Sequence, residues 1–152
     1  MNLAVVSNRV SRGEPNEPMT GGLAAALLPI VEKSGAIWVG SSGRVRDGNQ
    51  KEPFAEIEAL GTGALAMLDL PAAHYGGYYD GFANSALWPA LHSRADLIRA
   101  SQEDYASYRE VNAFMARALL RFQKPQSAFW IQDYHFLALG AELRTLGVRQ
   151  PI

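Results

Sequence analysis

The sequence lacks several features that would assign it to a particular class of protein. It has no cysteine, which excludes disulfide bonds and thiolate metal sites. It has no run of lysine and arginine and a formal net charge of −1, so neither nucleic acid nor a membrane surface is an expected partner. No apolar run approaches the roughly 18 residues of a membrane span, and no signal-peptide pattern precedes the first apolar segment. We therefore expect a cytoplasmic protein.

Common catalytic and cofactor motifs are also missing. The sequence has no G-x-x-x-x-G-K-[ST] phosphate loop, no H-E-x-x-H metal site and no G-x-S-x-G nucleophile elbow. His74, His92 and His135 lie far apart without metal-ligand spacing, so no metal site is predicted. The letters GTGALA (residues 61–66) match the G-x-G-x-x-A dinucleotide fingerprint. We reject that match, and with it a dinucleotide-binding oxidoreductase, because Pro71 follows too soon for a crossover helix.

The residues that are present indicate one globular α/β domain. A chain of 152 residues that is 48% hydrophobic and 19% charged is able to bury a substantial core. Apolar periodicity predicts strands at residues 3–6, 36–40, 54–60, 64–70 and 128–131, and helices at residues 22–33, 101–123 and 136–146. The runs 54–60 and 64–70 are expected to form a hairpin, 44–53 an exposed loop, and 148–152 the approach to another strand.

The opening segment, residues 3–28, contains the first candidate site. An apolar strand ends in Ser7-Asn8-Arg9, and Gly21 and Gly22 later begin an Ala/Leu-rich helix. Ligands bind at the carboxyl ends of strands in such sheets, and helix N-termini offer free N–H groups to anions. The pattern indicates a phosphate site, with the alternative that Arg9 is an ordinary surface residue and the glycines only form a turn.

Two further segments carry polar groups. Residues 71–94 combine aromatic side chains with glycine, too much glycine for one regular helix, and either pack irregularly in the core or line a carbohydrate site; we favour the second. The strand at 128–131 ends in Gln132-Asp133-Tyr134-His135, where site residues lie in α/β sheets. Asp133 is equally suited to N-cap the following helix, and both roles are compatible. The helix at 101–123 has a cap-like Ser101 and one apolar stripe, which we interpret as core.

Three stretches together resemble the trehalose-6-phosphate synthase family: VVSNR followed by GGL, then YYDGFANSALWPALH, and then FWIQDYHF followed by LGAELR. The resemblance implies a retaining glycosyltransferase of the two-Rossmann-domain (GT-B) type that transfers glucose from UDP-glucose to glucose 6-phosphate. Residues 1–152 would form the acceptor-side Rossmann-like N-terminal domain, incomplete at its C-terminal end. The donor-binding C-terminal domain would lie outside this chain, which alone is expected to be inactive.

The resemblance also implies roles for individual residues. The acceptor, glucose 6-phosphate, would be bound by Arg9, Tyr79, Trp88 and Asp133. The first three would hold its phosphate, and Asp133 would accept hydrogen bonds from its sugar hydroxyls. Gly21 and Gly22 would present backbone N–H groups to the donor, UDP-glucose. The family uses no covalent nucleophile, metal or cofactor, and the sequence leaves open whether the protein forms a homo-oligomer.

The sequence departs from the family pattern at Ser41, Asp80, Ser93 and Gln132. Asp80 would place a negative charge near the expected phosphate-binding residues. Two alternatives therefore stay open beside the synthase. One is a related enzyme with another acceptor, such as a glucosylglycerol-phosphate synthase, and the other is an inactive module that binds a sugar phosphate.

Overall fold

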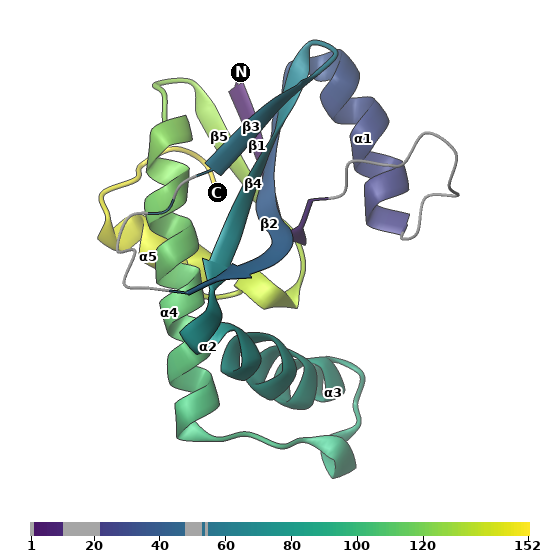
Figure 1. The fold of residues 1–152 in the computed structure, drawn as a ribbon, viewed down its shortest axis with the longest axis vertical. Helices are drawn as coiled ribbons and strands as arrows, with labels where there is room; N and C mark the ends of the chain where they lie inside the picture. Colours follow the sequence, from purple (N-terminus) through teal and green to yellow (C-terminus); the bar gives the residue numbers. More distant parts are fainter. Residues whose placement is uncertain (1, 11–21, 48–52, 54) are drawn as a thin grey trace.

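The computed structural model describes residues 2–10, 22–47, 53 and 55–152, and these form one five-stranded sheet with helices on both faces (Figure 1). The strand order is β3-β4-β2-β1-β5. The strands are β1 (Asn2–Arg9), β2 (Ile37–Arg46), β3 (Ala55–Leu60), β4 (Gly63–Pro71) and β5 (Ser127–Ile131). All neighbours pair in parallel except the hairpin β3–β4. This confirms the expected α/β, Rossmann-like fold.

Strand β1 lies at the centre of the sheet's parallel part. Val6 pairs with Val39 of β2 on one side and with Ile131 of β5 on the other. Successive side chains of a strand point to opposite faces, so the apolar run supplies two cores at once. Val5 joins the core on one face of the sheet, and Ala4 and Val6 join the core on the other.

Helices cover each face by the apolar stripe that the sequence predicts. Helix α1 (Gly22–Ser34) buries Ala24, Leu27 and Val31 against one face, while Pro29 lies on its exposed side. Helices α4 (Gln102–Leu119) and α5 (Leu139–Thr145) cover the other face (Figure 1). The Ser101 hydroxyl caps α4 by accepting the Asp104 N–H at 3.0 Å, as predicted. A 3₁₀ turn (Leu120–Phe122) extends α4 before β5 begins.

The glycine-rich segment 71–94 is helical for most of its length but, as expected, does not form one regular helix. Helix α2 (Ala72–Gly76) runs into a π-helix, η1 (Gly77–Leu87), and then into α3 (Trp88–Leu91). The reason is tertiary packing: Cβ atoms at Gly77 and Gly81 would lie 2.8 Å from Ser107 Cβ and 2.5 Å from Asp104 Cγ. The two glycines thus let η1 approach α4 closely, and their helix-breaking tendency is overridden.

Two other boundaries differ from those expected. Strand β2 continues to Arg46, although residues 44–53 are expected to be a loop, because a bulge after Ser41 lets Val45 and Arg46 pair with β4. Arg44 then reaches Asp69 at 3.1 Å and Glu56 at 3.5 Å. A 3₁₀ turn, η4 (Tyr134–Phe136), precedes α5 and delays its start relative to the expected residue 136.

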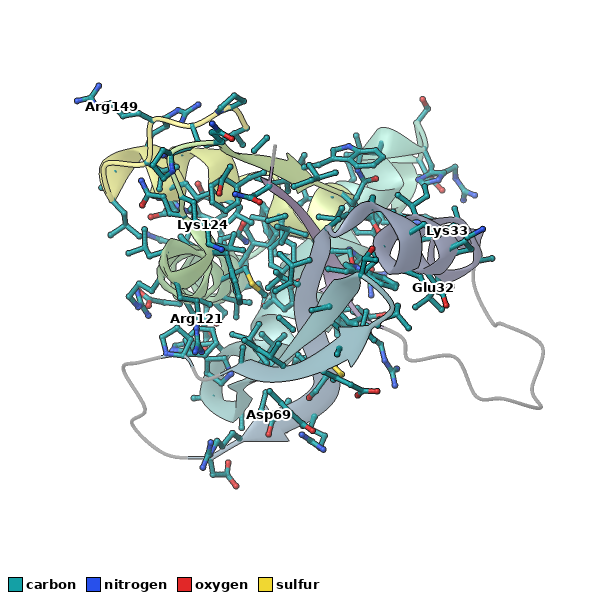
Figure 2. The ribbon with its side chains drawn as sticks, turned by 90° about the horizontal axis from the view of Figure 1, so that it is seen from above. Glu32, Lys33, Asp69, Arg121, Lys124 and Arg149 are labelled. Atoms are coloured by element: carbon teal, nitrogen blue, oxygen red, sulfur yellow. The ribbon has the colours of Figure 1, made fainter. Side chains whose placement is uncertain are left out.

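Three further features of the fold are the segment after α5, the connection before α4 and the charged surface. Residues 148–152 form no assigned strand, but the Phe129 N–H of β5 donates to Pro151 O at 2.9 Å. A further 3₁₀ turn, η2 (Ala95–Leu97), lies in the exposed connection before α4. Lys33 and Arg149, labelled in Figure 2, lie at the edges of the molecule in this view. Within the described ranges, no helix is long and apolar enough to cross a membrane.

The close approach of η1 to α4 makes Gly81 a sensitive position. We expect Gly81→Ala to lower the free energy of unfolding by about 1–3 kcal/mol, because the new methyl group overlaps Asp104. Gly76→Ala is the matched control: its Cβ meets nothing within 4 Å and its backbone is helical, so a gain of about 0.5–1 kcal/mol is expected. Urea denaturation of both variants measures the difference. Equal stability of the two variants would contradict the packing argument.

Candidate functional site

The carboxyl ends of β1 and β5 form the centre of the candidate site. The two strands are parallel neighbours, and their pairing continues beyond β5 through the Gln132 N–H, which donates to Val6 O at 2.7 Å. Asn8 and Arg9 therefore lie at the same edge of the sheet as Asp133. Helix α2 begins directly after β4, which brings the following η1 segment to this edge as well (Figure 1).

The Asp133 carboxylate is held by its own loop and faces solvent. Its backbone has φ 74° and ψ 160°, a region that non-glycine residues rarely adopt and that is frequent at functional sites. Its Oδ1 accepts the Tyr134 N–H at 2.7 Å, and the side chain keeps 42% of its area exposed. Asp133 therefore caps the short turn η4 and not α5, whose N-cap is Ala138. The capping prediction is correct in kind and wrong about the helix.

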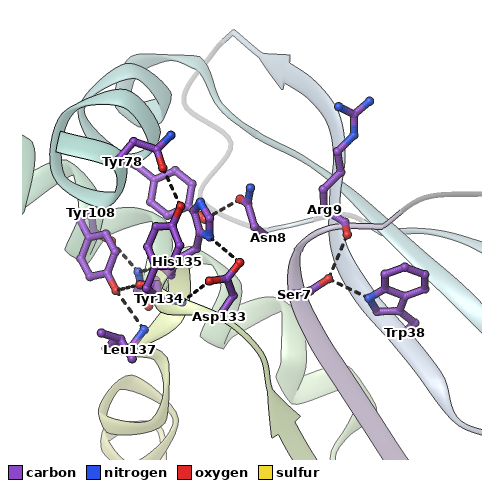
Figure 3. A network of polar contacts seen from close by, with 12 residues as sticks. Ser7, Asn8, Arg9, Trp38, Tyr78, Tyr108, Asp133, Tyr134, His135 and Leu137 are labelled. Carbon is purple, nitrogen blue, oxygen red and sulfur yellow. Dashed lines mark hydrogen bonds and ion pairs between the residues drawn. The ribbon is translucent and has the colours of Figure 1, made fainter. Parts of the chain in front are cut away.

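Tyrosine hydroxyls connect this loop to the rest of the fold (Figure 3). The Tyr78 hydroxyl donates to Asn8 Oδ1 at 2.8 Å, which ties η1 to the end of β1. The Tyr134 hydroxyl donates to Asn84 Oδ1 at 2.8 Å, which ties the β5 loop to η1. Burial raises the pKa of Tyr78 well above its ordinary value, so this hydroxyl stays protonated and remains a donor.

Tyr108 of α4 holds the same loop from beneath. Its hydroxyl donates to Tyr134 O at 2.8 Å and accepts the Leu137 N–H at 3.0 Å. Asn112, one turn later, donates to His135 O at 3.2 Å and is itself buried. The backbone of residues 134–137 is therefore fixed by side chains of a core helix, which explains how the unusual geometry of Asp133 is maintained.

His135 is a buried titratable group next to Asp133. Only 5% of its area is exposed, and its ring stacks on Tyr134 and Tyr79 at centroid distances of 4.2 and 5.5 Å. Nδ1 lies 3.3 Å from Asp133 Oδ2, within ion-pair distance, but neither Nδ1 nor Nε2 makes a hydrogen bond to a described residue. Burial lowers the pKa of His135, and the charge of Asp133 offsets this only in part, so the neutral imidazole is favoured.

Arg9 places a positive charge beside this cluster. Its carbonyl accepts the Ser7 hydroxyl at 2.9 Å, and Ser7 in turn accepts the Trp38 indole N–H at 2.8 Å, which anchors the backbone in the core. The Arg9 side chain is exposed, and its guanidinium packs against Gly43. A Cβ atom at Gly43 would lie only 2.8 Å from Arg9 Nη2. Gly43 has φ +86°, a second reason why this position suits glycine.

The structure brings some of the expected site residues together and leaves others apart. Tyr79 is half-buried and stacks between Tyr75 and His135, so it adjoins Asp133 through the imidazole. Arg9 is near enough to Tyr75 to lower its pKa, although burial and Tyr79 raise that pKa overall. The cation, the aromatic stack and the carboxylate thus share one side of the molecule.

Trp88 and the glycine pair are less closely connected to the cluster. Trp88, at the start of α3, is 41% exposed and stacks on His92 at 4.2 Å. No ring contact or hydrogen bond between described residues joins it to Arg9 or Asp133. Gly22 is the exposed first residue of α1 with open space around its Cβ position, and Gly21 lies outside the described residues.

Sequence reasoning missed the supporting residues of the site. Asn8 stands beside Arg9 in the polar end of β1, a signal that could have been used. Tyr78, Asn84 and Tyr108 carry no such signal, because the sequence pattern marks Tyr108 only as part of an apolar stripe. Their polar role depends on which carbonyl or amide the fold places opposite each hydroxyl.

The chemistry of this arrangement suits a polyol that carries an anion. A guanidinium binds phosphate by charge-assisted hydrogen bonds, a carboxylate accepts from hydroxyl groups, and aromatic rings pack on the apolar face of a sugar. Among the described residues, no three His, Asp or Glu side chains gather as metal ligands. The fold and the site together define one Rossmann-like domain of a GT-B glycosyltransferase.

The chain belongs to glycosyltransferase family 20, whose sequence model matches residues 2–152. It is 36% identical over 150 residues to the trehalose-6-phosphate synthase of Klebsiella pneumoniae, covering 99% of this chain and 31% of that protein. The chain therefore spans about a third of the length of such relatives, and it corresponds to their N-terminal part.

Solved structures agree with this assignment. The alpha,alpha-trehalose-phosphate synthase (UDP-forming) of Burkholderia vietnamiensis superposes with a TM-score of 0.88 at 39% identity, over 99% of this chain and 32% of that one. The corresponding enzyme of Burkholderia xenovorans, solved in complex with glucose-6-phosphate, gives a TM-score of 0.87 at 35% identity with the same coverage. An E. coli structure bound with UDP-2-fluoro glucose gives 0.82 at 35%, over 99% of this chain and 31% of that one.

The buried imidazole predicts a pH dependence of stability. The pKa of His135 is lowered in the folded chain, whereas an unfolded histidine titrates near about 6.5. As pH falls below that value the unfolded chain binds more protons, so the stability that depends on His135 is lost. From pH 7.5 to pH 5.5 the melting temperature of wild type should therefore fall relative to that of His135→Phe, which lacks the titrating group. A difference between the two melting temperatures that does not change with pH, or a relative rise of wild type, would contradict this prediction.

Proposed function

We propose that this chain forms the acceptor-binding side of an active site that transfers glucose from UDP-glucose to glucose 6-phosphate with retention, giving trehalose 6-phosphate and UDP. The observation that carries the proposal is the placement, at one sheet edge, of the exposed Arg9, the stacked Tyr79 and the oriented Asp133 carboxylate. Family membership and the glucose-6-phosphate complex of a relative support the same acceptor.

Each residue has a separate task in this proposal. Arg9 binds the phosphate by charge-assisted hydrogen bonds, with the Tyr79 hydroxyl and the Trp88 indole N–H as further donors. Asp133 accepts hydrogen bonds from the sugar hydroxyls through the carboxylate area that stays exposed. Trp88, the first residue of α3, is 41% exposed.

The donor side is proposed to lie mostly in a second domain outside these residues, with 1–152 as the acceptor-side domain. Gly22, the first residue of α1, and Gly21, which precedes it in the sequence, are proposed to present N–H groups to the donor diphosphate. Retention then follows from front-face attack, in which acceptor hydroxyl and leaving phosphate lie on the same side of the donor sugar. Catalysis consists of positioning and of stabilising the leaving group, and it requires no covalent nucleophile, metal or cofactor.

Asp80 supports one alternative. It is exposed, it follows Tyr79 directly, and its charge contributes to raising the pKa of Tyr75. A carboxylate at this position departs from the family pattern and alters the charge around the acceptor, which supports a related synthase with a different acceptor, such as a glucosylglycerol-phosphate synthase. Titration with glycerol 3-phosphate beside glucose 6-phosphate distinguishes the two acceptors by their affinities.

The phosphate role of Arg9 is tested by Arg9→Ala. A charge-assisted hydrogen bond is worth about 1.5–3 kcal/mol, so the Kd for glucose 6-phosphate in isothermal titration calorimetry should rise about tenfold to a hundredfold. Glucose without phosphate should bind wild type and variant equally. Arg149→Ala, which removes an exposed arginine from the segment after α5, is the matched control. An unchanged Kd for glucose 6-phosphate in Arg9→Ala would remove the proposed role.

The role of Trp88 is tested by Trp88→Phe, which keeps an aromatic ring for the contact with His92 and loses the indole donor. If Trp88 binds the phosphate, the Kd for glucose 6-phosphate rises severalfold while the melting temperature stays nearly constant. If Trp88 serves packing alone, the melting temperature falls and the Kd does not change. Calorimetry and thermal unfolding of the same variant give both values.

The chain by itself is expected not to transfer glucose. A cleft between two domains must hold donor and acceptor at attack distance, and one wall of it is proposed to lie outside residues 1–152. Incubation of the purified chain with UDP-glucose and glucose 6-phosphate should release no UDP above the level without protein. Release of UDP that requires both glucose 6-phosphate and the chain would refute this expectation.

A further inference from the structure

His135 has a position that neither packing nor the proposed phosphate site explains. A neutral imidazole that is 5% exposed occupies a place where an apolar ring would cost less, because neither ring nitrogen makes a hydrogen bond to a described residue. The nearest polar group that the structure gives the ring is the Asp133 carboxylate, whose Oδ2 lies 3.3 Å from Nδ1. The ring itself is fixed by stacking on Tyr79 and Tyr134.

The Asp133 carboxylate needs such a contact to keep one direction. Tyr134 N–H holds Oδ1 at 2.7 Å, and a single hydrogen bond leaves the carboxylate free to turn about its side-chain torsions. A second contact, from His135 to Oδ2, limits that rotation. Each oxygen retains a lone pair on its exposed side, where sugar hydroxyls would donate.

We infer that His135 is a positioning residue that orients the Asp133 carboxylate toward the acceptor sugar. The inference rests on the acceptor role of Asp133 under the proposed function. The required tautomer carries the proton on Nδ1, because a lone pair on Nδ1 would repel the carboxylate. Since 3.3 Å is longer than the about 2.7–2.9 Å of a strong charge-assisted hydrogen bond, the effect on affinity is moderate.

The stacking gives this residue a second connection. The Tyr79 ring lies nearly parallel to the imidazole, at an interplanar angle of 14°. Tyr79 is a proposed phosphate ligand, so the imidazole lies between the group that contacts the phosphate and the group that contacts the hydroxyls. A fixed ring at this place sets the spacing between the two ends of the acceptor.

The experiment is a double-mutant cycle read by calorimetric titration of the chain with glucose 6-phosphate. His135→Phe keeps the stacking ring and removes both nitrogens, and we expect it to raise Kd about five- to tenfold. His135→Asn places an amide N–H close to the position of Nδ1 and should stay within about twofold of wild type. In an Asp133→Ala background, His135→Phe should cause no further loss.

Each other result overturns the inference. Equal losses from His135→Phe with and without Asp133 would mean that the ring serves packing alone. Loss in Asp133→Ala without loss in His135→Phe would show that the carboxylate needs no positioning, while the proposed function stands. An unchanged Kd in Asp133→Ala would overturn both this inference and the acceptor role of Asp133, whereas the phosphate role is judged separately by Arg9→Ala.

A spectroscopic test on the wild-type chain does not depend on whether variants fold. ¹⁵N NMR of the His135 ring at pH 7.5 reports which nitrogen carries the proton. We expect the Nδ1–H tautomer, and in Asp133→Asn a shift of the His135 titration to lower pH, because the neighbouring negative charge is lost. A proton on Nε2 in the wild type would overturn the inference.

Discussion

The pairing of β1 with strands on both of its sides is the constraint on which the rest of the structure depends. Hydrogen bonds to β2 and β5 bury the apolar run of β1, and its alternating side chains supply the cores on both faces of the sheet. Because both neighbours run parallel to β1, the three strands end at one edge. Arg9 and Asp133, distant in sequence, therefore occupy the same side of the molecule, and the position of each depends on the register at Val6.

Aromatic and amide side chains at this edge of the sheet fix the segments of the site relative to one another. Tyr78 and Tyr108 are buried, yet each places its hydroxyl on a polar partner from a different segment, so they contribute to the core and fix the site together. The unusual backbone of Asp133 costs about 1–3 kcal/mol, and it persists because the surrounding hydrogen bonds leave no relaxed alternative. The π-helix beside it is a further departure from regular structure of the kind that is enriched at functional sites.

The distribution of charge within the site follows from burial. Arg9 is exposed and its backbone carbonyl accepts the Ser7 hydroxyl, while no described residue forms an ion pair with its guanidinium, which is therefore able to meet a ligand. His135, by contrast, is buried and favours its neutral form. The Asp133 carboxylate is intermediate in exposure, because part of its area is in contact with solvent. This arrangement matches a ligand with two different ends. The positive charge suits an anionic end, the partly exposed carboxylate suits an end that bears hydroxyl groups, and the neutral ring stack lies between them. This is the chemical basis for assigning the acceptor side of the reaction to this chain.

The sequence by itself determined the elements with strong local patterns. The strand at residues 3–6, the hairpin around residues 61–63 and the helix capped by Ser101 follow from apolar periodicity, turn residues and side-chain capping, which act over a few neighbouring positions. Motif resemblance also indicated the family and named Tyr79 and Asp133 as site candidates. Tertiary structure decided how the glycine-rich segment packs, because the absence of side chains at Gly77 and Gly81 lets this helical segment lie against α4. It likewise decided that His135 is buried against Asp133, since a hydrogen-bonding or stacking partner far away in the chain is fixed by packing and leaves no local trace in the sequence.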